Sequence, residues 1–475
     1  MTSREPQNPA LAWLQDDLLG LVSGDVRTDD VARQLYSSDG SPFEEKPRAV
    51  VWPRSVQDVA NVVNYARENG LSIHPRGAGS SAAAGSIGSG IILDFSRHMR
   101  RVLHAGDGFI RVQPGAVRER VNDQLRTSRK EFFAPSSGHV PTGTIGSILS
   151  VDNIGPRWLR YGAPHESVIE LKVVLADGSI QTLRPFKSLP AESIKITSGQ
   201  ARRKFLNAAL VDANVAAAQN EHGAPAFDEE FDAKLAAALS DPLQKSEFGH
   251  DFHDGYGLRS FRSDFVRDEY FLRAFGSDAH ALRKLLRVDP WASALRVIRR
   301  YESSLDVEQT STSPCRCGFA LRDVVRQGFD PTRFFTGSEG ALGIIVEATL
   351  STFLDPEARG STILLFDSLD LAARAVPHVL QFDPTLCDLL DSRVVTLTRD
   401  WDARFEAAFP QGSEAALVVE LDGDSDEDVR RRMDELQRVA REKLGSFGRW
   451  IAYTEEDRNL FRDLLRRSSC ARLRV

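Results

Sequence analysis

The feature that most constrains this sequence is a glycine-rich segment that joins two predicted strands. Pro75-Arg76-Gly77-Ala78-Gly79-Ser80-Ser81 leaves a predicted strand at 71–75, and the next predicted strand is 91–95. Its two glycines can adopt positive φ and let backbone N–H groups approach a ligand, and its two serines add hydroxyl donors. The segment therefore predicts a phosphate-binding or pyrophosphate-binding loop. A glycine-rich surface loop without a ligand is the alternative for this motif taken alone.

A dinucleotide-binding Rossmann unit is a second alternative for the same residues. The letters satisfy G-x-G-x-x-A through Ala82, and Asp94 stands at the end of the following strand. A Rossmann glycine loop must open a crossover helix, but three further glycines interrupt the short stretch between Gly79 and the next strand. The predicted helix, 56–69, precedes the loop instead. The order β-α-β-loop-β therefore argues against a Rossmann unit.

Two later segments again combine glycine with small and hydroxyl side chains. The second cluster spans 136–146 and is followed by Asn153, Gly155 and Arg160-Tyr161-Gly162, and the third cluster spans 337–345. Small residues bury little surface and lose much entropy on ordering, so such strings are unfavourable without a ligand. The pattern favours a long ligand that lies against the backbone.

The chain as a whole predicts an α+β protein. Residues 1–45 predict an N-terminal helical arm, and short strands and helices then alternate up to about 186. Residues 186–330 are helical and charge-rich without strand alternation, which indicates an insertion. From 362 to 475, strands and helices again alternate, which predicts a second α+β domain.

Composition excludes several classes of protein. A formal net charge of −7 lacks the basic excess of a nucleic-acid binder. No stretch approaches the roughly 18 apolar residues of a transmembrane segment, and the first residues do not resemble a secretory signal. The four cysteines are too scattered for a disulfide framework or an iron–sulfur cluster. The expected compartment is the cytoplasm or the inner face of its membrane.

The ordered motifs resemble a known family. PRGAGSS, IILDFSRHMRRVL, APSSG, GTIGSILSVDNIG, RWLRYGAP, VIELKVVLADGS and TGSEGALGIIVEATL resemble FAD-linked oxidases of the p-cresol methylhydroxylase/vanillyl-alcohol oxidase superfamily. The likeness is to the glycolate oxidase D-subunit and D-lactate dehydrogenase branch, and to the N-terminal part of long D-2-hydroxyacid dehydrogenases that carry FAD and an iron–sulfur module. It implies a two-subdomain PCMH-type FAD-binding domain over 46–354, with the insertion at 186–330. An incomplete ferredoxin-like cap domain would follow over 355–475.

The resemblance also implies the cofactor site. FAD would lie between the two subdomains without a covalent bond, because members with covalent flavin carry a histidine where Ser80 stands. The implied FAD-binding residues are Arg76, Gly77, Ala78, Gly79, Ser80, Ser81, Ser136, Gly138, Thr144, Ile145, Gly146, Asn153, Arg160, Tyr161, Gly162, Gly343, Ile344 and Ile345.

This chain departs from the family at several positions. Ser147, Asp152 and Ile154 stand where the family carries a glycine, an asparagine and an alanine. The family's H-x-x-x-G-D-G-N-x-H metal element and its catalytic histidine have no counterpart here, so no catalytic residue is assigned. His139 and His165 lie in the implied flavin loops and are the candidate general bases. A structural hydrogen bond is the alternative role for each.

The implied activity is oxidation of a small D-2-hydroxy acid of the D-lactate, glycolate or D-2-hydroxyglutarate type, by hydride transfer to flavin N5. Electrons would pass to a separate acceptor protein or quinone, such as an iron–sulfur polypeptide. The alternative is an FAD-binding fragment or subunit without activity of its own. No metal site is predicted, because His250-Asp251-Phe252-His253-Asp254 favours a solvated turn. Cys315 and Cys317 favour small buried residues over a disulfide.

Overall fold

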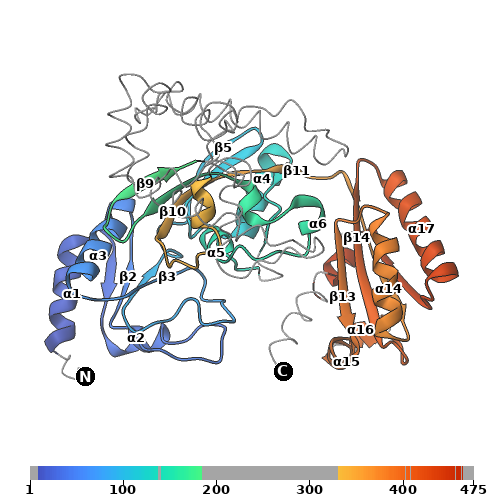
Figure 1. Cartoon of the computed structure of the whole chain (residues 1–475), viewed down its shortest axis with the longest axis horizontal. Helices are drawn as coiled ribbons and strands as arrows, with labels where there is room; N and C mark the ends of the chain where they lie inside the picture. The colour runs from blue at the N-terminus through green and yellow to red at the C-terminus, as the bar shows by residue number, and fades with distance from the viewer. Residues whose placement is uncertain are drawn as a thin grey trace, which may run out of the picture.

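Two bodies of secondary structure stand side by side in this protein (Figure 1). The computed structural model describes residues 9–136, 141–184 and 330–463, without positions 402, 407, 455 and 462. The predicted insertion at 186–330, apart from residue 330, lies outside the described residues. So do Gly138, His139, the 250–254 motif and the Cys315-Cys317 pair.

The first body begins with a four-stranded sheet of order β1-β2-β4-β3. Its strands are β1 (Asp25–Arg27), β2 (Ala49–Trp52), β3 (Ile73–Arg76) and β4 (Ile91–Asp94). Strands β2 and β3 both run parallel to β4, and helix α3 (Val56–Glu68) joins β2 to β3. No helix interrupts 77–90. The predicted order β-α-β-loop-β is confirmed.

The N-terminal residues belong to the same core. Helix α1 (Pro9–Leu21) buries Leu14 and Leu18 against the residues that α3 covers, and β1 pairs antiparallel with β2. A short helix, α2 (Asp30–Leu35), follows β1. The predicted boundary at residue 45 thus falls inside one hydrophobic core, because helical periodicity gives no signal for a three-residue strand.

A five-stranded antiparallel sheet of order β5-β6-β10-β8-β9 completes the first body. The strands are β5 (Val102–Gly106), β6 (Phe109–Val112), β8 (Val168–Val174), β9 (Ile180–Leu183) and β10 (Ile344–Ser351). The predicted hairpin at Asp177-Gly178 joins β8 to β9, with Gly178 at φ +78°. Helices α4 (Arg118–Arg129) and α5 (Ile145–Val151) bury apolar side chains in the core beside this sheet.

The second body is a sheet of order β13-β14-β12-β15, antiparallel throughout. Its elements are β12 (Ala358–Phe366), α14 (Leu369–Leu380), β13 (Leu386–Asp391), α15 (Ser392–Trp401), α16 (Ala403–Glu406), β14 (Ala415–Gly423), α17 (Asp426–Lys443) and β15 (Gly448–Ala452). Helices α14 and α17 cover one face (Figure 1). Four strands and two covering helices in this order form a ferredoxin-like unit. Within the described residues, no helix could span a bilayer.

Candidate functional site

The three glycine clusters converge around helix α5. A Cβ atom at Gly77 in the first cluster would lie 2.3 Å from Thr144 Oγ1 in the second. Thr144 is the N-cap of α5, and its side chain accepts a hydrogen bond from Ser147 N–H. In the third cluster, the N–H groups of Gly337 and Glu339 donate to carbonyl oxygens of α5, at 3.0 Å and 2.9 Å. Segments more than 250 residues apart in sequence are thus brought to one place.

The first loop presents backbone donors. Among the described residues, no N–H group from 77 to 81 donates a hydrogen bond to another part of the protein. Gly79 adopts φ +66°, and both Ala78 and Ser80 are exposed. A run of unpaired N–H groups in an accessible loop suits the oxygens of a diphosphate. The residues present therefore fit the phosphate part of FAD.

The guanidinium of Arg76 packs against this loop at Gly79. It donates to Ser38 O at 3.0 Å and Ser86 O at 3.2 Å, and lies over the Tyr36 ring at 4.9 Å. A Cβ at Gly79 would lie 2.4 Å from Arg76 Nη2. The side chain of Arg76 therefore donates its hydrogen bonds to other residues of the protein. The groups of this loop that can donate to a ligand are the backbone N–H groups that follow Arg76.

Asp94, the residue on which the Rossmann alternative depends, is only 3% exposed. Tyr36 donates to its carboxylate, and Trp52 Nε1 donates to the same oxygen at 3.1 Å. Burial and the Asp94 carboxylate raise the pKa of the Tyr36 phenol above its ordinary value. Asp94 thus anchors the sheet and is not available to a ribose hydroxyl.

The other implied site residues take different positions. Ser136 and Thr144 of the second cluster are buried, and Asn153 is exposed. The side chains of Ile145, Ile344 and Ile345 lie in hydrophobic cores, so only their backbone could face a ligand. Gly343 has Val174 O within 2.8 Å of its would-be Cβ, which shows that it packs against β8.

His165, a candidate general base, is buried in the 3₁₀ turn Pro164–Ser167. Its Nδ1 lies 2.7 Å from Asp152 Oδ2, and its backbone N–H donates to Asp152 Oδ1 at 3.0 Å. Burial lowers the pKa of the neighbouring Arg333 to about 10, and Asp152 opposes this shift. The exposed fraction of His165 is 4%, so the geometry favours a structural role. In the part of the chain that is described, no His, Cys, Asp or Glu cluster could hold a metal ion.

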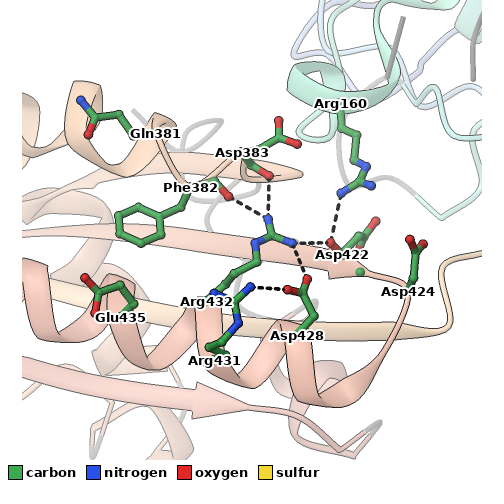
Figure 2. Close-up of a pocket in the computed structure, with 11 residues that line it drawn as sticks. Arg160, Gln381, Phe382, Asp383, Asp422, Asp424, Asp428, Arg431, Arg432 and Glu435 are labelled. Atoms are coloured by element: carbon green, nitrogen blue, oxygen red, sulfur yellow. Dashed lines mark hydrogen bonds and ion pairs between the residues drawn. The ribbon is translucent and has the colours of Figure 1, made fainter. Parts of the chain in front are cut away.

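The first body and the second body meet at a polar junction that was not predicted from the sequence. Tyr161 ends helix α6 (Trp158–Tyr161), and its hydroxyl donates to Asp422 Oδ2 at 2.6 Å. Arg160 Nη1 donates to Asp422 O at 3.1 Å, and Arg157 Nε lies 2.8 Å from Glu420 Oε1. A cavity of about 450 Å³ lies beside the contact between Arg160 and Asp422 (Figure 2). One feature of the sequence could have indicated this junction: Glu420 and Asp422 lie two residues apart, and so on one face, in the otherwise apolar strand β14.

Burial and charge pairing shape this junction. Asp422 is fully buried and Glu420 is 8% exposed. Burial opposes the charge of Arg157, but Glu420 and Asp422 raise the pKa of Arg157 above its ordinary value. Burial and Asp422 likewise raise the pKa of the Tyr161 phenol. Tyr161 is therefore a neutral hydrogen-bond donor and Arg157 a permanent cation.

The fold and the converging glycine loops define a two-domain flavoprotein. Residues 47–184 match a model described as an FAD binding domain, and residues 355–473 match a model of the C-terminal domain of FAD linked oxidases. Together the two matches cover more than half of the chain. The chain belongs to the FAD-linked oxidases. The predicted fold class and the FAD cofactor are thereby confirmed.

The curated relatives of this chain include hydroxy-acid dehydrogenases and a glycolate oxidase subunit. The chain is 24% identical over 446 residues to D-2-hydroxyglutarate dehydrogenase of Haemophilus influenzae, covering 91% of this chain and 35% of the relative. It is 23% identical over 447 residues to glycolate oxidase subunit GlcD of Bacillus subtilis, covering 92% of this chain and 64% of the relative. The chain thus spans about a third of the length of the dehydrogenases that it matches. A solved alkyldihydroxyacetonephosphate synthase, 13% identical, shares the fold with a TM-score of 0.55 over 99% of this chain and 64% of that one.

Proposed function

We propose that this chain is the flavin-binding part of a dehydrogenase that oxidises a small D-2-hydroxy acid. The observation that carries the proposal is the convergence of three glycine clusters on α5, with N–H groups at 77–81 that donate to no other residue in the part of the chain that the structure describes. The names of the curated relatives support the substrate class: D-2-hydroxyglutarate dehydrogenase and a glycolate oxidase subunit.

Each part of the chain has a separate task in this proposal. The loop 77–81 binds the diphosphate through its backbone, and Thr144 holds the second loop against it. When bound, FAD supplies a two-electron acceptor for the hydride of the hydroxy acid. The second body contacts α6 and its N-cap through the buried Tyr161–Asp422 hydrogen bond and the Arg157–Glu420 ion pair, so it stands beside the flavin loops. Such fixed placement of the two bodies is what orients substrate and cofactor.

The electrons leave through a partner in this proposal. The four cysteines of the chain include no C-x₂-C-x₂-C run that would bind a cluster within it. The acceptors that we propose are an acceptor protein, such as an iron–sulfur polypeptide, or a quinone. The proposed compartment is the cytoplasm or the inner face of its membrane.

The test is an absorption spectrum of the purified chain followed by anaerobic titration with D-2-hydroxyglutarate, D-lactate and glycolate. We expect an oxidised flavin spectrum that bleaches with one acid. If that acid is D-2-hydroxyglutarate or D-lactate, the spectrum should remain unchanged with its L-enantiomer. Bleaching isolates the first half-reaction, so no acceptor is needed. A chain that holds NAD, or no nucleotide after incubation with FAD, would contradict the proposal.

A second candidate function is an FAD-binding subunit that has no activity alone. It is supported by the fraction of the relatives' length that the chain spans. A stoichiometric flavin that no hydroxy acid bleaches would favour this candidate over the first.

A further inference from the structure

The contact between the two bodies reaches the helix around which the glycine clusters gather. Asp422 accepts from Tyr161, and Tyr161 is four residues before His165. His165 pairs with Asp152, which is the C-cap of α5. The N-cap at the other end of the same helix is Thr144, which touches the first glycine loop at Gly77. A short series of buried contacts thus joins β14 to the phosphate loop.

Every polar group along this series is held in place. Tyr161 packs edge-on against Phe132 and Phe353, with ring centroids 5.2 Å and 5.0 Å away. Asp422 has a second partner, Arg359, whose Nε donates to Oδ1 at 3.1 Å. Arg359 also donates to Asp355 at 3.0 Å. If Tyr161 shifted, the buried carboxylate of Asp422 would lose one of its hydrogen-bond donors, which is unfavourable for a buried charge.

The backbone after Tyr161 turns sharply at Gly162. Gly162 adopts φ 75° and ψ −174°, a conformation that is essentially restricted to glycine. It leads directly into the turn that buries His165. The Tyr161 hydroxyl is thus anchored to Asp422 only three residues before the turn Pro164–Ser167 that supports α5.

We propose that Asp422 is a positioning residue for the cofactor site. Through Tyr161, this carboxylate of the second body fixes the segment 157–165 and, with it, α5 and the phosphate-binding loop. The inference rests on the proposed function, because it concerns the same FAD site. Its consequence is specific: the affinity for FAD depends on a side chain that lies outside the matched FAD-binding domain.

The experiment compares Asp422→Asn, Tyr161→Phe and the double variant with the parent chain. Asp424→Asn is the matched control, since Asp424 is an exposed carboxylate two residues after Asp422, just beyond the end of β14 (Figure 2). The dissociation constant of FAD is measured by flavin fluorescence on flavin-free protein. Thermal unfolding of the flavin-free protein is followed by circular dichroism.

We expect each single variant to raise the dissociation constant of FAD by about tenfold, which corresponds to about 1.4 kcal/mol. The double variant should be no worse than the poorer single variant, because both changes break one contact. Asp424→Asn should bind FAD as the parent does. Tyr161→Phe keeps the ring between Phe132 and Phe353 and so carries the test if Asp422→Asn does not fold.

Unchanged FAD affinity in the single variants would overturn the inference, even if their unfolding temperature fell. That result would show that the contact only holds the two bodies together. Fully multiplicative effects in the double variant would also overturn it. A parent chain that binds no FAD would overturn the proposed function itself, and the inference with it.

Discussion

His165 Nδ1 and Asp152 Oδ2 lie 2.7 Å apart in the interior of the FAD-binding body. Both side chains are almost fully buried, with exposed fractions of 4% and 3%. Asp152 adopts φ +49° at the C-cap of α5 and accepts a second hydrogen bond, from the His165 backbone. The pair therefore closes the turn between α5 and β8 and is placed for structure more than for proton transfer.

Replacing His165 should cost stability. Because His165→Ala removes the imidazole from a buried carboxylate, we expect the free energy of unfolding to fall by about 3 kcal/mol. Asp152→Asn, which keeps the shape and installs the residue usual in the family, should cost less than about 1.5 kcal/mol. Urea unfolding measures both. If His165→Asn abolished flavin reduction while leaving stability and FAD content unchanged, the histidine would be the general base after all.

The contact between the first two glycine clusters should limit the size of residue 77. A Cβ in Gly77→Ala would lie 2.3 Å from Thr144 Oγ1, so the two loops must separate. We expect at least about tenfold weaker retention of FAD. The double change Gly77→Ala and Thr144→Ala should recover part of the loss, because it removes the obstructing atoms. Gly20→Ala is the control, because a Cβ added at Gly20 would have no atom within 4 Å apart from the adjacent backbone of its own helix. Equal FAD retention in all of these variants would exclude this loop as the cofactor site.

Gly79→Asp should also prevent FAD retention while most of the fold persists. The aspartate backbone would have to adopt φ +66°, which L-residues rarely do, and its Cβ would lie against the Arg76 guanidinium. It would also bring a negative charge to the loop that binds the diphosphate. Flavin content per protein, read from the visible spectrum, measures the effect. A soluble Gly79→Asp variant with a full complement of FAD would contradict it.

The flavin should be bound without a covalent bond. Ser80 stands where members with covalent flavin have a histidine, and Ser80 cannot form that bond. Precipitating the protein with acid should release the whole of the flavin into the supernatant. Flavin that stays with the denatured polypeptide would contradict this prediction.

Asp58 should contribute to stability in a pH-dependent way. Its carboxylate is 5% exposed and accepts from Ser23, Arg54 N–H and Ser55, at 2.9 Å, 2.9 Å and 2.8 Å. Burial opposes ionisation of Asp58, but these hydrogen bonds lower its pKa below the ordinary value of 3.8.

A lowered pKa in the folded state means that the stabilisation by Asp58 is complete above pH 3.8 and is lost as the pH falls further toward the folded pKa. Asp58→Asn should lower the free energy of unfolding by about 1–2 kcal/mol at pH 7. The difference between parent and variant should shrink at pH 3, as urea unfolding at both values would show. A difference that stays the same at both pH values would contradict the assignment.

The sequence alone determined the local architecture of the cofactor site. The helix at 56–69, the strand, loop and strand around 77–90 and the hairpin at Asp177-Gly178 each depend on residues that are neighbours in the chain. Glycine conformations, helix caps and apolar periodicity act over a few residues, and can therefore be inferred from the order of the letters. The order of the three glycine clusters was enough to indicate the family.

Only the tertiary structure decided how these pieces meet. Gly77 touches Thr144, Arg76 turns inward to Ser38 and Ser86, and Tyr161 binds Asp422 across 261 positions of the chain. The same holds for β1, which local periodicity did not show and which pairing with β2 stabilises. Such contacts form where distant segments bury polar groups together, and the free energy of each depends on the partner that folding brings to it. That partner is set by packing of the whole chain, which no local pattern of residues specifies.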